Sequence, residues 1–212
     1  MILPLPFIKL IGSLAKFKTG ILLSGGMDSV ALTYWKRPSH AFSIDYGQKP
    51  AIAEIQAAKQ VCRHLGIDHH IIQVDCSSLG SGDLSGQSSL SISPCSEWWP
   101  YRNQLILTLA AMKAVSFGIE ELIIGSVKTD DVHKDGTNTF FELMSEILRY
   151  QEGNISILAP AIDLTTQELI KESHIPVSVL LWSHSCQTSN IPCMNCNGCK
   201  KYLFNIQQLD LD

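Results

Sequence analysis

The sequence predicts an α/β fold in which a mostly parallel sheet carries helices on both faces and a small cysteine-rich subdomain follows. Two observations support this prediction. Strand-like and helix-like segments alternate along the chain, and repeated strand–helix units are typical of parallel sheets. Near the C-terminus, four cysteines fall within fourteen residues, which is far denser than the rest of the chain.

The expected elements follow one another in a regular order. Apolar residues three or four apart from Ile52 to Leu65 mark one face of a helix that Gly66 ends, and Thr165 with Glu168 forms a capping box that opens a later helix. The expected strands are 21–23, 41–45, 71–74, 121–124 and 155–158. The expected helices are 30–35, 52–65, 104–117, a helix lined by Phe140, Phe141, Met144, Ile147 and Leu148, and a helix from 165 toward 171.

The composition limits the class of protein. The 212 residues suit one domain with a small appendage, and 45% hydrophobic residues against 17% charged ones provide for a sizeable core. A net charge of −4 argues against general nucleic-acid binding, which needs a basic face. The stretch from Met1 to Leu10 is apolar, contains Pro4 and Pro6 and lacks the basic start of a signal peptide, and no apolar run approaches the length of a membrane span. We expect an N-terminal arm that forms a strand or contacts a partner.

The cysteine count indicates the compartment. Seven cysteines without a secretion signal argue against a disulfide framework. A cytoplasmic protein is therefore expected.

The stretch Ser24-Gly25-Gly26-Met27-Asp28-Ser29 is the most informative part of the chain. It lies between an apolar run that ends at Leu23 and a run that can be helical. The glycines allow a sharp turn, so that backbone N–H groups, two serine hydroxyls and the positive end of a helix can point at one anion. The pattern S-G-G-x-D-S resembles the pyrophosphate loop of the ATP pyrophosphatases. An ordinary strand-to-helix turn is the alternative.

Other residues are expected beside this loop. In parallel sheets ligands bind beyond the carboxyl ends of the strands, where Asp45, Gln48 and Gly125 should also lie. The serine- and glycine-rich stretch from Ser77 to Trp99 predicts a mobile loop over the site, with a disordered surface insert as the alternative.

The C-terminal cysteines predict a structural metal site. Thiolates two residues apart can converge on one tetrahedral ion, and a four-cysteine site has no open position for catalysis. Zinc is the first choice for this ligand set and an iron–sulfur cluster is the competitor. The predicted ligands are Cys186, Cys193, Cys196 and Cys199.

The chain resembles the 7-cyano-7-deazaguanine synthases of queuosine biosynthesis, which are QueC-like PP-loop enzymes. The resemblance spans about Thr19 to Leu209. Besides the phosphate loop and the cysteines, it rests on Asp45-Tyr46-Gly47-Gln48-Lys49, Pro100-Tyr101-Arg102-Asn103, Gly125 with Asp130, and Ala159 to Leu164. It implies a Rossmann-like fold of the adenine nucleotide alpha hydrolase type. The implied division is an arm over 1–18, an ATP-binding domain over 19–175 and a zinc-binding subdomain over 176–212.

The resemblance implies an ATP-dependent ligase that forms a C–N bond. ATP and Mg²⁺ would activate the carboxylate of a 7-carboxy-7-deazaguanine-type acid as an adenylate, and ammonia or an amine of a partner protein would attack it. Asp28 would bind Mg²⁺, Arg102 would hold a phosphate or the substrate carboxylate, and Asp130 would be a substrate or metal ligand. Asn103 either takes part in catalysis or caps the following helix, and Lys49 contacts phosphate or is solvated. The family is also expected to form a homodimer.

Three departures from the family fall on the acceptor side. Residues His133 to Phe141 replace the family's base-reading stretch, Tyr101 stands where the family has glycine and should fill space, and two extra residues lie between Trp182 and Cys186. These departures favour a divergent member that attaches a deazaguanine to a partner protein in antiviral defence. Nitrile synthesis is the competing activity. The alternatives are a tRNA sulfurtransferase that uses Cys76 or Cys95, and a nucleotide-binding protein with a decayed site.

Overall fold

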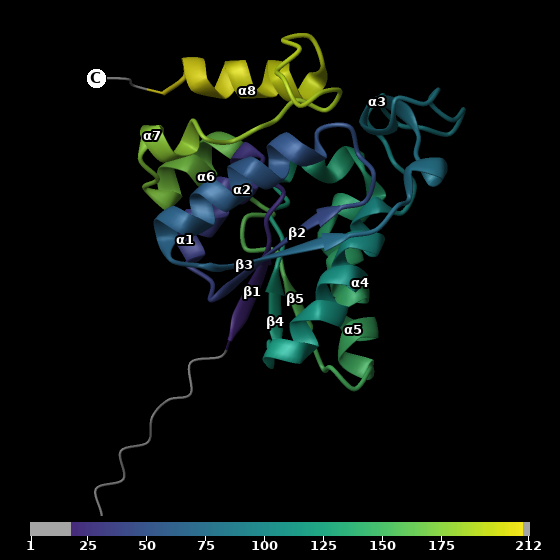
Figure 1. Cartoon of the computed structure of the whole chain (residues 1–212), viewed down its shortest axis with the longest axis vertical. Coiled ribbons are helices and arrows are strands. Elements are labelled where there is room, and N and C mark those ends of the chain that lie inside the picture. Colours follow the sequence, from purple (N-terminus) through teal and green to yellow (C-terminus); the bar gives the residue numbers. More distant parts are fainter. Residues whose placement is uncertain (1–17, 210–212) are drawn as a thin grey trace, which may run out of the picture.

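A five-stranded parallel sheet forms the centre of the molecule in the computed structural model, which describes residues 18–209 (Figure 1). The strand order is β3-β2-β1-β4-β5, and every neighbouring pair is parallel. This confirms the predicted fold class. The expected arm falls almost wholly outside the described residues. The strands are β1 (Thr19–Leu22), β2 (His40–Asp45), β3 (Asp68–Gln73), β4 (Glu121–Ile123) and β5 (Ser156–Leu158).

The strand order places a ligand crevice beside β1. From β1 the chain adds β2 and β3 on one side, and then returns to add β4 and β5 on the other side. The segments that leave β1 and β4 therefore diverge to opposite faces of the sheet. Such a reversal opens a crevice at the carboxyl ends of the two central strands.

Apolar side chains of the central strand alternate between two cores. Ile21 and Leu23 belong to one buried cluster, whereas Leu22 between them belongs to the other. This alternation follows from the two-residue period of a strand. Both faces of the sheet are therefore buried, as parallel sheets require.

Helices cover both faces of the sheet, as Figure 1 shows. One cluster contains buried residues of α1 (Met27–Lys36), α2 (Ala51–Leu65), α6 (Thr166–Ser173) and α7 (Val177–Leu180). The other contains those of α4 (Arg102–Ala114), which continues as a 3₁₀ turn over Val115–Phe117, and α5 (Asn138–Tyr150).

Two predicted helix signals are confirmed in detail. Gly66 ends α2 in the left-handed conformation with φ 67°. At the start of α6, Thr165 accepts a hydrogen bond from the backbone N–H of Glu168, and the Glu168 carboxylate accepts from the backbone N–H of Thr165. The capping box therefore sets the start of α6.

The segment Ser77 to Trp99 is more ordered than a featureless loop. It contains a 3₁₀ turn at Ser77–Leu79 and a short helix α3 (Gly82–Ser85). Leu84 and Trp99 are buried in the same core as α4 and α5. Because serine and glycine dominate this segment, its sequence gives little indication that Leu84 and Trp99 are buried.

The C-terminal part lies over the carboxyl edge of the sheet (Figure 1). It consists of an irregular segment with Cys186, Cys193 and Cys196, followed by α8 (Asn197–Gln207), which carries Cys199. The short turns 128–132 and 134–136 complete the same end of the molecule. Within residues 18–209, no helix combines the length and the apolar character needed to cross a membrane.

The packing of α6 against α1 yields a stability prediction. Leu169 on α6 is fully buried in the core that supports α1, so Leu169→Ala should lower the free energy of unfolding by about 3 kcal/mol. Leu143→Ala on α5 is the control, because Leu143 is 54% exposed, and its cost should stay within about 0.5 kcal/mol. Urea unfolding measures both, and equal losses would contradict this account of the core.

Candidate functional site

A cavity of about 300 Å³ opens at the carboxyl edge of the sheet, between the loops that follow β1 and β4. Most of the sequence-predicted site residues meet there. Those that line it are Leu23, Ser24, Gly26, Met27, Asp28, Ser29, Gln48, Arg102, Gly125 and Asp130. Gly25 and Asp45 are not among the lining residues. The Asp45 carboxylate instead accepts a hydrogen bond from the backbone N–H of Gly47 at 3.2 Å.

The loop from Ser24 to Ser29 has the geometry of an anion site. The two serine hydroxyls lie 3.1 Å apart, and the backbone N–H of Gly26 donates to the Ser24 hydroxyl at 3.3 Å. Helix α1 begins directly after Gly26 at Met27. Its first N–H groups and its positive dipole end therefore face the cavity, where a phosphate group would be stabilised.

Two glycines allow the close approach of backbone segments in this loop. Gly25 has φ 83°, and a Cβ there would run into the backbone carbonyl of Glu54. Gly125 follows β4, and a Cβ there would lie 3.1 Å from Cα of Ser29. A larger residue at either position would push the loop away from its neighbours.

Lys201 from α8 reaches into the cavity and pairs with Asp28. Its Nζ lies 2.9 Å from Asp28 Oδ2 and 3.7 Å from Asp130 Oδ1. Burial opposes the charge of this ammonium group, but the two carboxylates together raise its pKa above the ordinary value. Sequence reasoning missed Lys201, which is separated from Asp28 by 173 positions.

The second oxygen of Asp28 indicates where a cation fits. Asp28 Oδ1 is buried and has no hydrogen-bond partner among the described residues. A buried carboxylate oxygen without a partner is costly, and hard oxygen ligands are what Mg²⁺ prefers. The Asp28 side chain therefore fits the metal role that was expected for it.

Asp130 anchors the turn that follows β4. Its Oδ2 accepts from the backbone N–H of Val127 at 3.1 Å and from the Ser126 hydroxyl at 3.3 Å. Its Oδ1 faces Lys201. The carboxylate is thus held in place by its own turn while one oxygen remains directed toward the cavity.

Arg102 and Asn103 open α4 at the cavity wall, and one expectation for Asn103 is wrong. The cap position of α4 is Tyr101, and Asn103 lies within the helix. The Asn103 side-chain amide donates to the backbone carbonyl of Asp135 at 2.7 Å, and its own backbone N–H donates to the Asp135 carboxylate at 3.1 Å. A carboxylate from another turn therefore satisfies the helix start.

Asp135 also contributes to the charge balance of Arg102. Burial opposes the guanidinium charge, but Tyr46, Asp135 and other nearby acids together raise the pKa of Arg102. A planar cation thus lies in the cavity wall, where it can bind a phosphate or carboxylate with two hydrogen bonds.

The expectation that Tyr101 fills space in the site is also wrong. Tyr101 is 78% exposed and does not line the cavity. Its backbone has φ 54°, in the left-handed region that favours glycine. The family's glycine at this position is therefore explained by the backbone conformation, and the tyrosine ring adds a surface side chain. Lys49 is likewise exposed and does not line the cavity.

A hydrogen-bond chain around Gln48 forms another part of the cavity wall. The Gln48 amide donates to the carbonyl of Ile44 at 3.0 Å and to Glu54 Oε2 at 2.9 Å, and its oxygen accepts from the backbone N–H of Tyr46. Burial raises the pKa of Glu54 to about 7. Sequence reasoning gave Glu54 no role, although the α2 pattern marks it as the acid nearest the loop.

The C-terminal segment is tied directly to the phosphate loop. The backbone N–H of His184 donates to the carbonyl of Gly25 at 2.9 Å. The Asn190 side chain accepts from the backbone N–H of Ala53 near the start of α2 at 3.0 Å. The two extra residues between Trp182 and Cys186 thus lie in a segment that contacts the loop.

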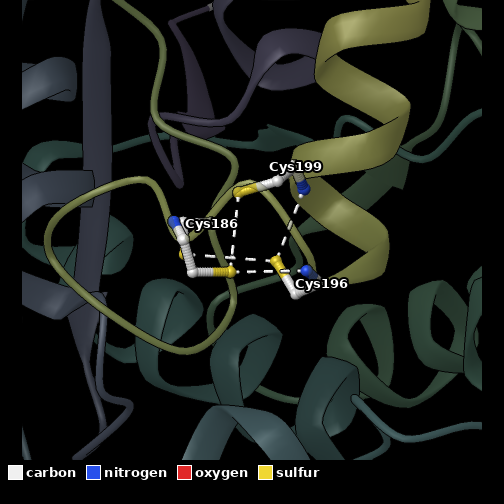
Figure 2. A group of neighbouring side chains, drawn as sticks. Cys186, Cys196 and Cys199 are labelled. Carbon is white, nitrogen blue, oxygen red and sulfur yellow. Dashed lines mark hydrogen bonds between the residues drawn. The ribbon is translucent and has the colours of Figure 1, made fainter.

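The four predicted cysteine ligands converge in one knot. Figure 2 shows three of them, Cys186, Cys196 and Cys199, with their sulfur atoms turned toward one another. The sulfurs of Cys193 and Cys199 are 3.9 Å apart, and those of Cys186 and Cys196 are 4.0 Å apart. Tetrahedral zinc with four thiolates requires sulfur separations of about 3.8 Å. The four cysteines could therefore hold zinc.

Comparison with known proteins identifies related sequences over nearly the whole chain. The family model described as "Queuosine biosynthesis protein QueC" matches residues 18–205. The 7-cyano-7-deazaguanine synthase 1 of Desulfitobacterium hafniense is 30% identical over 199 residues, covering 88% of this chain and 90% of that protein. The 7-cyano-7-deazaguanine synthase of Methanocaldococcus jannaschii is 29% identical over 209 residues, covering 85% and 90%.

NMN synthetase from Francisella tularensis is similar over 91% of this chain and 78% of its own, with 15% identity and a TM-score of 0.44.

The tight approach at Gly25 yields a binding prediction. Gly25→Ala should weaken the binding of inorganic pyrophosphate at least tenfold, because the new Cβ displaces the loop from Glu54. Gly66→Ala is the matched control. Gly66 also has positive φ, but a Cβ there meets nothing within 4 Å. Both variants should lose about 1 kcal/mol of stability from backbone strain. Titration calorimetry that finds equal affinity in the two variants would contradict the assignment of the loop.

The raised pKa of Glu54 yields a pH prediction. The folded state keeps a proton on Glu54 up to about pH 7, whereas the unfolded chain loses it near its ordinary pKa of 4.5. The contribution of Glu54 to stability is thus present below pH 4.5 and falls as pH rises to 7. Between pH 4.5 and 7 the free energy of unfolding of the wild type should fall by an amount on the order of 1–3 kcal/mol that is due to Glu54. Glu54→Gln should not show this fall, because glutamine does not titrate. Urea unfolding of both proteins at a series of pH values measures the difference, and parallel curves would refute it.

Proposed function

Because this chain belongs to the family of queuosine biosynthesis protein QueC, we propose that it is an ATP-dependent ligase acting on a 7-carboxy-7-deazaguanine-type acid. The relatives compared above are named 7-cyano-7-deazaguanine synthases. The observation that carries the proposal is the cavity itself. An anion-binding loop, two cationic side chains and a carboxylate oxygen with no hydrogen-bond partner within residues 18–209 face one another there.

The adenylation step would divide among these residues. An oxygen of the acid attacks the α-phosphorus of ATP, the bond to the bridging oxygen of the β-phosphate breaks, and pyrophosphate leaves. The loop from Ser24 to Ser29 would hold the departing pyrophosphate, and Lys201 would balance its growing charge. Asp28 and Asp130 are the proposed ligands of Mg²⁺, which would spread charge over the phosphate oxygens. Arg102 would orient the acid or a phosphate.

The second step would form the C–N bond. An amine nitrogen attacks the activated carbonyl carbon, AMP leaves with the bonding electron pair, and the nitrogen loses a proton. With ammonia as the amine, a second adenylation of the amide oxygen followed by loss of AMP gives the nitrile. We propose a cytoplasmic enzyme that carries zinc in the C-terminal subdomain and assembles as a homodimer.

A protein amine is the second candidate acceptor. The substitution of residues 133–141 favours it, because this stretch lacks the cysteine, arginine and proline of the family's base-reading segment. A sulfurtransferase finds less support. Such an enzyme needs a reactive thiolate at the nucleotide site, and neither Cys76 nor Cys95 lines the cavity.

Turnover of the whole protein tests this proposal. Purified enzyme with 7-carboxy-7-deazaguanine, Mg·ATP and ammonium should release AMP and pyrophosphate, and mass spectrometry should find the amide or nitrile. Absence of AMP formation with this acid would refute the proposed function. An adenylate that is consumed only when a partner protein is added would favour the second acceptor.

Lys201→Met should slow AMP formation at least tenfold, because the charge beside Asp28 is lost. Lys200→Met is the matched control. Lys200 is exposed and does not line the cavity, so its loss should leave the rate unchanged. Equal rates in the two variants would remove Lys201 from the phosphate site while leaving the assigned reaction intact.

A further inference from the structure

A second group of metal-binding side chains lies beside the nucleotide cavity, apart from the four-cysteine knot. It consists of Cys95, Glu97 and His133, whose ligand atoms all lie within 4.8 Å of one another. Cys95 and Glu97 come from the end of the serine-rich segment, and His133 comes from the turns after β4. We propose that these three side chains bind a second divalent metal ion, with zinc as the preferred ion.

The separation of the two softer ligands matches a shared metal ion. Cys95 Sγ lies 3.5 Å from His133 Nε2. For tetrahedral zinc with ordinary bond lengths to sulfur and nitrogen, the two ligand atoms stand about 3.6 Å apart. A thiol–imidazole hydrogen bond has a similar length, and Cys95 also lies within hydrogen-bond reach of Glu97. The observation that favours an ion is that all three ligand atoms lie within 4.8 Å of one another.

The Glu97 carboxylate is held in position by Asn197. Its Oε2 accepts from the side-chain amide of Asn197 at 3.1 Å. An ionised carboxylate has several lone pairs, so it can accept this bond and still bind a metal ion. Hydrogen bonds of this kind orient ligands around protein metal sites and strengthen binding.

The three side chains are partly exposed, so a metal ion bound to them would have one coordination position open to solvent. Three protein ligands leave a fourth position for water or for an oxygen or nitrogen atom of a small molecule, as in catalytic zinc centres. With one thiolate, one carboxylate and a neutral imidazole, the ligand set would neutralise a divalent ion. Thiolate and imidazole select zinc over magnesium or calcium.

The position of the cluster connects it with both other sites. The backbone N–H of His133 donates to the carbonyl of Asp130 at 3.0 Å, and Asp130 lines the nucleotide cavity. Asn197 directly follows Cys196, one of the four cysteines of the knot. The proposed ion therefore lies between the cavity and the knot, on the side where this chain departs from its family. The inference does not depend on the proposed ligase activity.

Metal analysis of the whole protein tests the inference. Protein purified without chelator and equilibrated with zinc should contain two zinc ions per chain by mass spectrometry. Cys95→Ser and His133→Gln should each retain one, and Glu97→Gln should weaken the second ion about tenfold or more. Cys76→Ser is the matched control, because Cys76 is also partly buried but lies outside both groups, and it should retain two.

Cobalt substitution separates the two sites by their spectra. Cobalt bound to four thiolates gives intense sulfur-to-metal absorption, and the second equivalent should add a weaker band that disappears in Cys95→Ser. Circular dichroism confirms that each variant is folded. A wild-type protein that holds one ion even with excess zinc would overturn the inference. So would a second ion that persists in both Cys95→Ser and His133→Gln.

Discussion

The ion pair between Asp28 and Lys201 is the contact that organises the site. Asp28 lies in the first turn of α1 and Asp130 lies in the turn after β4. Two carboxylates that contact the same group would repel each other without a cation between them. Lys201 supplies that cation from the last helix of the chain. The C-terminal part is therefore a wall of the cavity as well as the carrier of the four clustered cysteines. The loop after β1 gives the anion site its shape, and α8 gives it charge balance.

The sheet explains why residues from such distant positions meet. Parallel strands end at one edge, and the reversal of direction beside β1 leaves room there for a ligand. The glycines at the ends of β1 and β4 then bring backbone segments closer than side chains would allow. The C-terminal segment closes the arrangement through backbone contacts with the loop. Each of these contributions is local in space, although the residues span most of the sequence.

Sequence reasoning succeeded where the signal is local. The five strands, the capping box at Thr165 and the four cysteines each depend on neighbouring residues, and all were predictable. It failed where residues far away in the sequence set the role of a residue. Asparagine is a common N-cap residue, but at Asn103 the carboxylate of Asp135 accepts the hydrogen bond at the helix start. Tyr101 occupies a glycine position without entering the cavity, because its ring points to the surface. Lys201 carries no local sign of its partner 173 positions away.

The alternation of Ile21, Leu22 and Leu23 between two cores has a consequence for how this family can diverge. A substitution in β1 changes the packing of one core and leaves the other intact. An insertion or deletion in β1 changes the packing of both cores. Loss of one residue would exchange the sides of every apolar group that follows and draw Ser24 back by about 3.3 Å. We therefore expect insertions and deletions to be tolerated in the surface connections and not between β1 and the loop that follows it.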